Sequence, residues 1–252
     1  MLLKDMMCKH GTFLFRGRSH LPLALTPLLA AAVLQPAAFD HWFSRRAELI
    51  WVLGSLAIAF SGILVRVLTT GFVPAGTSGR NTSSQIAESL NTTGLYSVTR
   101  NPLYLGNFMV MLGIVLATKV WWMVLIATIA FALYYERIIF AEESFLEAKF
   151  GEDYRRWAGS TPVFFPNFRL WQAPPRTFSI RTVLRREFHG VYLIVVVFTL
   201  VELGHDLTEG ATLSGWIDKG FAWSTFFWAG TLLYLILVLL KKRTKLLEAA
   251  GR

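Results

Sequence analysis

The sequence has little charge and almost no cysteine for its length. Only 16% of its 252 residues are charged, and the single cysteine, Cys8, excludes a disulfide within the chain and a metal site built from several cysteines. Hydrophobic residues make up 54% of the chain, and the mean hydropathy is +0.47. This composition is too apolar for an ordinary soluble domain and predicts an integral membrane protein with several helical spans.

The sequence also lacks a concentrated basic surface, although its net charge is +9. Lys and Arg lie in the loops and tails between apolar segments, a distribution that favours anionic lipid and control of topology over nucleic acid. His205 and Asp206 are adjacent, but no further ligands stand at metal spacing. We therefore expect neither a nucleic-acid partner nor a metal.

Six apolar segments follow one another along the chain. They are Leu21–Phe39, Leu49–Phe72, Pro102–Ala117, Val120–Ala141, Val191–Leu203 and Phe221–Leu240. Only the second, fourth and sixth approach the ~20 residues that cross a bilayer comfortably, because prolines break the first and the third is short. The pattern predicts one membrane domain over residues 1–252, an all-α polytopic bundle of about six transmembrane helices.

Basic residues predict the orientation of these spans. With both termini in the cytoplasm, the inner loops and tails hold 19 Lys and Arg and the outer loops hold four. This bias follows the positive-inside rule. Between the spans, Gly71–Gly94 is rich in Gly, Ser, Thr and Asn and is expected to be a loop, and Glu142–Glu187 is expected to lie along the membrane surface.

The third and fourth segments are joined only by Thr118 and Lys119, so they must be antiparallel neighbours. If the two segments run antiparallel from this turn, residues equally far from it lie level with each other. Arg100 is then level with Arg137, and the Glu142–Glu143 pair is level with Gly94. Polar groups therefore converge at one cytoplasmic mouth of the bundle. The set comprises Tyr96, Arg100, Asn101, Tyr104, Tyr134, Tyr135, Glu136, Arg137, Glu142 and Glu143.

Such a cluster in an apolar wall favours a site for a polar ligand. Carboxylates accept hydrogen bonds from hydroxyls and amines, and Arg100 binds carboxylates. Pro102 suits the first position of a helix, whose free amides beside Arg100 would favour an anionic group. Taken singly, these charges would instead be expected to pair with one another or reach the lipid headgroups.

The stretch GLYSVTRNPLYLGN and the later stretch ERIIFAEESFLEAKFGEDYRRW resemble the membrane methyltransferases related to isoprenylcysteine carboxyl methyltransferase and phosphatidylethanolamine N-methyltransferase. The first motif is matched by Gly94, Tyr96, Arg100, Asn101, Pro102, Tyr104 and Gly106, and the second by Arg137, Glu142, Glu143, Leu146, Phe150, Gly151 and Tyr154. The resemblance covers residues 92–166, which form the motif core, and hardly extends to residues 187–252, a C-terminal helical pair. Asn101 stands where the family has His, and Arg137 lies about one residue earlier than the pattern expects.

The resemblance implies S-adenosylmethionine bound at the cytoplasmic mouth and a membrane lipid or lipidated substrate that arrives from the bilayer. It implies that Arg100, Arg137 and Glu143 are catalytic. It also implies that the cofactor is held by Tyr96, Arg100, Asn101, Pro102, Tyr104, Gly106, Glu142, Glu143 and Tyr154.

The acceptor is left open by the sequence. An ionised phosphate or carboxylate needs no general base, whereas an amine must lose a proton, and Asn101 cannot take one. We therefore expect an anionic oxygen acceptor on a lipid. The alternatives are a phospholipid amine N-methyltransferase, an NADPH-dependent enzyme of the sterol-reductase type, and a non-catalytic membrane scaffold.

Overall fold

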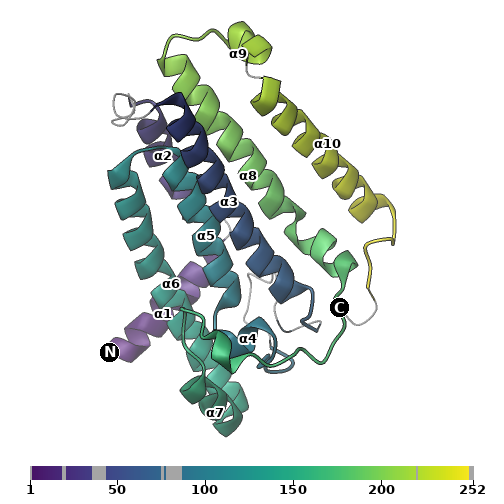
Figure 1. Ribbon diagram of the computed structural model, residues 1–252. Coiled ribbons are helices and arrows are strands. Elements are labelled where there is room, and N and C mark those ends of the chain that lie inside the picture. The colour runs from purple at the N-terminus through teal and green to yellow at the C-terminus, as the bar shows by residue number, and fades with distance from the viewer. Residues whose placement is uncertain are drawn as a thin grey trace.

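The computed structural model describes residues 2–18, 21–35, 44–74, 77, 87–219 and 221–249. Within these ranges the chain forms helices and no β-strand, as predicted. The elements are α1 (Leu3–Gly17), η1 (Leu21–Leu25), α2 (Thr26–Val33), α3 (Arg45–Thr70), α4 (Leu95–Val98), α5 (Pro102–Ala117), α6 (Trp121–Phe150), α7 (Glu152–Ser160), η2 (Phe168–Leu170), α8 (Ile180–Thr208), α9 (Leu213–Lys219) and α10 (Phe221–Arg243). The long helices run lengthwise beside one another, with α4 and α7 at one end and α9 at the other (Figure 1).

Four helices in the described residues are long and apolar enough to cross a membrane. They are Arg46–Thr70, Trp121–Phe150, Ile180–Thr208 and Ala222–Arg243. The short apolar helices are Leu23–Val33 and Pro102–Ala117, which correspond to the first and third predicted segments. The protein is therefore an integral membrane protein with four helices of spanning length, and the predicted count of about six is not reached by length alone.

Two predicted segments are longer than the apolar pattern indicated. The fourth continues as α6 to Phe150 rather than stopping near Ala141, because its polar residues still have helical spacing and the first glycine comes at Gly151, where φ is +55°. The fifth begins as α8 at Ile180, where the Ser179 hydroxyl accepts a hydrogen bond from the Thr182 amide at 3.3 Å. Both ends of the segment Glu142–Glu187 therefore belong to long helices, and its position along the membrane surface stays a prediction.

The N-terminal residues form a helix that the sequence analysis did not anticipate. α1 packs against α6, and the Cys8 thiol lies 3.5 Å from the Ser144 hydroxyl. Further along, the first apolar segment is helical only to Val33, and residues 36–39 lie outside the described ranges. The predicted loop Gly71–Gly94 is described only at residues 71–74, 77 and 87–94.

The centre of the bundle is the contact between α3 and α5. A Cβ added to Gly106 would lie 2.7 Å from the Gly62 carbonyl oxygen, and one added to Gly113 would lie 2.5 Å from the Ser55 carbonyl oxygen. Glycine therefore lets the two backbones touch, as small residues do between helices in membranes. Around this contact, α8 and α2 complete an apolar core with residues such as Val33, Ile194 and Phe198.

The turn between α5 and α6 consists of Thr118, Lys119 and Val120. Lys119 has a φ of +58°, and its ammonium lies 2.8 Å from a Glu48 carboxylate oxygen on α3. The predicted antiparallel hairpin is confirmed. At the outer edge, α10 packs on α8, and only 11% of its most apolar window is buried.

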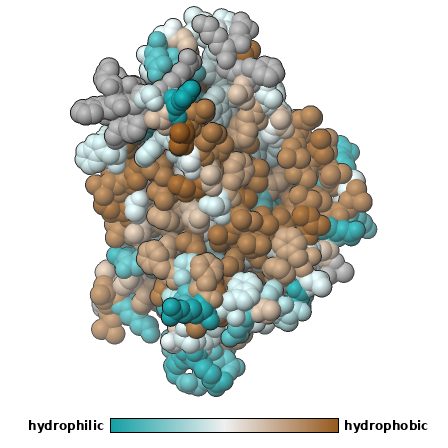
Figure 2. Space-filling view, viewed as in Figure 1, coloured by the Kyte–Doolittle hydropathy of each residue, from teal (hydrophilic) through white to brown (hydrophobic). Residues whose placement is uncertain are grey.

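The distribution of hydrophobic residues over the surface is the one expected of a membrane protein. Figure 2 shows hydrophobic residues over the middle of the molecule and hydrophilic ones gathered at the end where α7 lies. Large exposed side chains on α6 include Leu125, Ile129 and Leu133, and those on α10 include Leu232 and Leu239.

Candidate functional site

The two motif stretches meet at the end of the bundle that carries α4 and α7, which we call the mouth. The Arg100 guanidinium lies 3.2 Å from a Glu143 carboxylate oxygen, and the Tyr104 hydroxyl donates a hydrogen bond of 2.8 Å to Glu142. The predicted convergence is confirmed. Its register differs, since Arg100 lies beside Glu143 rather than level with Arg137. Residues 99–101, between α4 and α5, are not helical and cover more length per residue.

Tyr154 on α7 completes a polar triad with Arg100 and Glu143. Its residue is only 5% exposed, and the charges of Glu143 and Arg100 both act on its phenol. Burial, reinforced by the Glu143 charge, raises the pKa of the Tyr154 phenol well above its usual value. The hydroxyl therefore stays neutral at physiological pH and can donate a hydrogen bond.

Two atoms of this triad are buried and lack a hydrogen-bond partner among the described residues. They are Nε of Arg100, a donor, and Oε1 of Glu143, an acceptor. Glu143 Oε1 still lies 3.2 Å from Nη1 of Arg100, so it is held by the ion pair, whereas the Arg100 Nε donor is left without a partner. Buried polar atoms are nearly always paired in native proteins, so this donor beside an ion pair favours a ligand that carries charged groups of both signs. The carboxylate and ammonium of an amino acid moiety have this character.

Residues 161–172, which we call the strap, run beside residues 94–101 at the mouth. Main-chain hydrogen bonds join the two: Arg100 N donates to Pro162 O at 2.8 Å, Asn167 N to Val98 O at 2.9 Å, and Gly94 N to Gln172 O at 2.8 Å. Side chains add to them, since the Thr99 hydroxyl donates to Phe164 O at 2.9 Å. The strap thus fixes the backbone that carries Arg100.

Asn101 contributes to the strap rather than to the polar triad. Its side-chain amide donates a 2.9 Å hydrogen bond to the Val163 carbonyl, and the residue is followed by Pro102, the first residue of α5, as predicted. The helix start therefore lies directly beside Arg100. The residue that stands in place of the family's His has a structural contact in this chain.

Tyr96 on α4 lies on the inner side of the mouth. Burial, with a further contribution from the Glu142 charge, raises the pKa of its phenol well above the usual value. The charges of Arg186 and Arg66 act on it in the opposite direction. The Trp157 indole donates a 3.1 Å hydrogen bond to the Tyr96 carbonyl, which fixes α4 against α7.

Two residues named by the motifs do not join the polar cluster. Gly106 faces α3, where an added Cβ would lie 2.6 Å from Cγ of Arg66, so its place is explained by close packing. Arg137 pairs with Glu136 at 3.0 Å and lines a hollow between α1 and α6. Of the residues predicted for the site, the structure brings together Tyr96, Arg100, Tyr104, Glu142, Glu143 and Tyr154, with Asn101 and Pro102 at the edge.

A second polar network, beside the mouth, was missed by the sequence analysis. Arg66 on α3 makes a bidentate pair with Glu187 on α8, at 2.7 and 3.2 Å, and donates a 2.6 Å hydrogen bond to Asn107 on α5. The Asn107 amide in turn donates to the Tyr135 hydroxyl at 3.0 Å. An Arg within an apolar segment is ordinarily expected to extend to the headgroups. In the sequence, the feature that could have indicated this pair is Glu187, an acidic residue just before the fifth apolar segment.

α1 also reaches the mouth. The Arg18 guanidinium lies 3.8 Å from Glu142 and 4.0 Å from the centre of the Phe15 ring. The pairing with Arg18 was not predicted, because the N-terminal residues were taken as a tail. The structure thus surrounds Glu142 with groups from α1, α5 and α6.

No group of three or more His, Cys, Asp or Glu side chains that could hold a metal ion occurs in the described part of the chain. The arrangement instead offers a charged pair, neutral tyrosine hydroxyls and main-chain amides. These groups can bind and orient a zwitterionic ligand beside an apolar wall.

Comparison with known proteins agrees with the motifs. Residues 49–153 match the family described as phospholipid methyltransferase. The chain is 31% identical over 169 residues to the nickel-cobalt-cadmium resistance protein NccN of Alcaligenes xylosoxydans xylosoxydans, covering 60% of this chain and 77% of that protein. It is 33% identical over 190 residues to the cobalt-zinc-cadmium resistance protein CzcN of Cupriavidus metallidurans, covering 67% and 88%. No solved structure matches significantly.

Proposed function

The chain belongs to the phospholipid methyltransferase family, and we propose that it uses S-adenosylmethionine to methylate an anionic oxygen on a membrane lipid or lipidated molecule. The observation that carries this proposal is the polar triad of Arg100, Glu143 and Tyr154, in which Arg100 is paired with Glu143 at 3.2 Å while its buried Nε donor makes no hydrogen bond among the described residues. It lies beside helices of membrane-spanning character.

The residues at the mouth fit the cofactor's amino acid end. Arg100 would hold its carboxylate and Glu143 its ammonium, with the start of α5 close to the same carboxylate. When bound, the cofactor supplies an electrophilic methyl group on a positively charged sulfur. Tyr96 and Tyr104 would present neutral aromatic groups to the adenine or to that charge. The strap would help to exclude water from the reacting atoms.

An anionic oxygen acceptor requires no proton transfer from the protein. As the new C–O bond forms, the C–S bond breaks, so the acceptor loses its negative charge and the sulfur its positive charge. The protein needs only to align the two reactants. Asn101 supports this choice, since its amide is bonded to the Val163 carbonyl and has no basic function.

The orientation of the site is also part of the proposal. The excess of Lys and Arg in alternate loops supports both termini, and with them the mouth, on the cytoplasmic side. We retain Arg137 as a predicted residue of the second motif, but the triad, not Arg137, is the basis of the mechanism proposed here.

The names of the two relatives refer to resistance to divalent metal cations. The proposed reaction offers a physical link, because each methyl transfer to an anionic lipid oxygen removes one negative charge from the membrane surface. A less negative surface attracts fewer cations. We expect cells that lack this protein to have a more negative surface and lower tolerance of cadmium, and unchanged electrophoretic mobility of their membranes would contradict the link.

The proposal is tested by incubating the purified protein in lipid nanodiscs with methyl-labelled S-adenosylmethionine. The panel should include phosphatidylglycerol and phosphatidic acid as anionic lipids and phosphatidylethanolamine as the amine lipid. We expect label only on the anionic lipids, in a product identified by mass spectrometry as a methyl ester. Label confined to the amine lipid would support the N-methyltransferase alternative, and binding of NADPH instead of S-adenosylmethionine would support a reductase.

Direct binding of S-adenosylmethionine gives a second readout. Replacing Glu143 by Gln removes the charge that would pair with the cofactor's ammonium, and we expect binding to weaken by about tenfold or more. Glu152→Gln is the matched control, because Glu152 is an exposed α7 residue paired with Arg155. Equal binding by the wild type and Glu143→Gln would contradict the assignment of the triad.

A further inference from the structure

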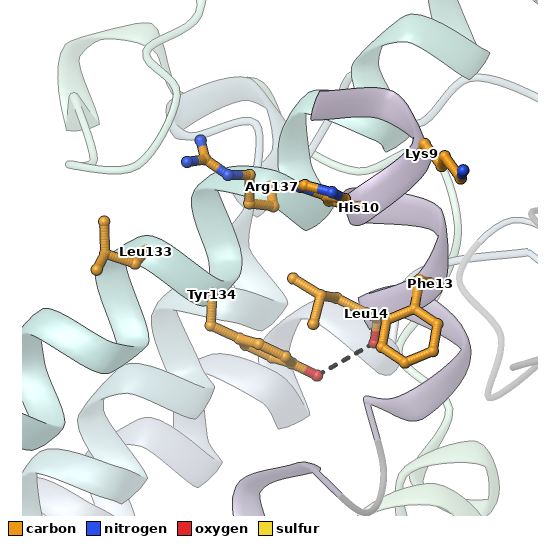
Figure 3. Close-up of a pocket in the computed structure, with 7 residues that line it drawn as sticks. All are labelled: Lys9, His10, Phe13, Leu14, Leu133, Tyr134 and Arg137. Carbon is orange, nitrogen blue, oxygen red and sulfur yellow. Dashed lines mark hydrogen bonds between the residues drawn. The ribbon is translucent and has the colours of Figure 1, made fainter. Parts of the chain in front are cut away.

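A hollow of about 540 Å³ lies between α1 and α6, apart from the polar triad. It is lined by Lys9, His10, Phe13, Leu14, Leu133, Tyr134 and Arg137. Figure 3 shows α1 on one side and α6 on the other, with the Tyr134 hydroxyl joined to the Leu14 carbonyl by a 3.3 Å hydrogen bond across the hollow. Its volume is in the range of small-molecule sites.

The two ends of the hollow differ in chemistry. His10 and Arg137 stand at one end in Figure 3, and Lys9 lies on the same helix as His10. Within the part of the chain that the structure describes, no hydrogen bond or ion pair engages the side chain of Lys9 or His10, which both lie in α1. Arg137 pairs only with its exposed neighbour Glu136, at 3.0 Å. Such an exposed pair contributes little energy, so the guanidinium can turn to a phosphate.

The apolar end is open to lipid. Phe13 is 70% exposed and Leu133 is 57% exposed. On α6, Leu133 continues a stripe of exposed side chains at a spacing of four residues, Leu125, Ile129 and Leu133, and Arg137 comes one turn further. The stripe from Leu125 to Arg137 is about 18 Å long at the helical rise, which is roughly the depth of one leaflet of a ~30 Å hydrocarbon core.

We propose that this hollow binds an anionic phospholipid, with its phosphate against Lys9, His10 and Arg137 and one acyl chain along the stripe of α6. The phosphate neutralises the basic end, which a zwitterionic headgroup would do less well. The acyl chain covers Leu133 and Phe13. The bound lipid would hold α1 against α6, and α1 carries Arg18 to Glu142 at the mouth. The site is separate from the triad and does not depend on the reaction proposed above.

The experiment is a lipid titration of the full-length protein in detergent, followed by native mass spectrometry. Dioleoyl phosphatidylglycerol is compared with dioleoyl phosphatidylcholine, and inorganic phosphate is offered alone in a third arm. We expect the anionic lipid to bind about tenfold or more tightly than the zwitterionic one, since each basic residue contributes to binding an anionic headgroup. Free phosphate at the same concentration should leave no retained adduct.

Two variants test the basic end and the apolar end of the hollow separately. Lys9→Gln with Arg137→Gln should weaken phosphatidylglycerol binding about tenfold, whereas the matched pair Lys242→Gln with Arg243→Gln, in the last turn of α10, removes the same charge and should leave it nearly unchanged. Leu133→Trp fills the apolar end and should weaken binding without changing charge. Leu232→Trp on α10 is its control, at a comparably exposed position.

Several results would overturn the proposal. They are equal binding of both lipids, equal losses in the two charge variants, retention of free phosphate as strongly as lipid, and no effect of Leu133→Trp. Circular dichroism of each variant establishes that it is folded, and a variant that fails this check is replaced by His10→Gln or by Leu133→Phe, for which the same direction of change is expected.

Discussion

α5 contacts α3 and α6 in opposite ways. Towards α3 the backbones touch, because Gly106 faces Gly62 and Gly113 faces Ala59. Towards α6 they are held apart by rings, as in the Tyr104–Tyr135 contact, whose centroids are 4.5 Å apart. The first face leaves no space for a ligand, and the polar groups of the mouth lie at the start of the second. The packing that holds the bundle together and the candidate site therefore lie on separate faces of one short helix, α5.

Asn107 connects the two faces. It accepts a hydrogen bond from Arg66 on the α3 side and donates one to Tyr135 on the α6 side. Through Arg66 the connection continues to Glu187, so α8 is joined to the same network. The C-terminal helical pair, which the motifs hardly cover, therefore contributes a buried charge beside the site.

The prediction with the largest expected loss of stability tests the connection from Asn107 through Arg66 to Glu187. Glu187 is 3% exposed, and its removal in Glu187→Ala leaves Arg66 without its carboxylate partner. We expect the free energy of unfolding in detergent to fall by about 3–5 kcal/mol. Replacing both Arg66 and Glu187 by Met should recover most of the loss, because no buried charge then remains unpaired. A double variant as unstable as the single one would contradict this account.

The next effect tests the tight face. Gly106→Ala places a methyl group against the Gly62 carbonyl and the Arg66 side chain, and we expect a loss of about 1–3 kcal/mol from overpacking. Thermal unfolding followed by fluorescence measures it. Gly159→Ala on α7 is the control, because nothing lies within 4 Å of the added Cβ. Equal melting temperatures for wild type and Gly106→Ala would show that the backbones are not in contact.

A substitution on the face of α5 that packs against α6 should reduce stability less. Phe131 on α6 contacts Phe108 and stacks on Tyr135, with ring centroids 5.1 and 4.1 Å away. Because rings on this face can rearrange, we expect Phe131→Leu to cost less than about 1.5 kcal/mol. A loss greater than that of Gly106→Ala, measured in the same assay, would remove the contrast between the two faces.

The smallest effect concerns the strap. Asn101→Ala removes one hydrogen bond, to the Val163 carbonyl, at an exposed position. We expect about 0.5–1.5 kcal/mol of lost stability and faster hydrogen exchange at residues 161–167. Loss of methyl transfer with unchanged exchange would instead give Asn101 a chemical role.

The sequence predicted most of the mouth and little of what surrounds it. A short turn and two motifs were enough to bring Arg100 and Tyr104 to the Glu142–Glu143 pair. The prediction from the turn missed the register, because it assumed one continuous helix through residues 99–101, which the structure shows to be non-helical. It also could not show that Tyr154, on a separate helix, is buried beside the charges of Arg100 and Glu143.

Other features depend on contacts between segments far apart in the chain. Arg66 and Glu187 are separated by 121 residues, and either charge alone is equally consistent with extension to the headgroups. α1 has few apolar residues in a row, so its helix was not predicted. Gly106 was assigned to the cofactor by its motif, whereas the structure shows a packing reason for glycine that the motif alone does not reveal.

The strap is joined to residues 94–101 mainly through main-chain atoms, whose donors and acceptors are the same for every residue except proline. Most side chains of residues 162–168 can therefore change in evolution without opening the mouth. Phe165 and Phe168, which are 80% and 69% exposed, are free to vary with the lipids of the host membrane. Selection can thus alter the rim of the site while the position of Arg100 is inherited unchanged.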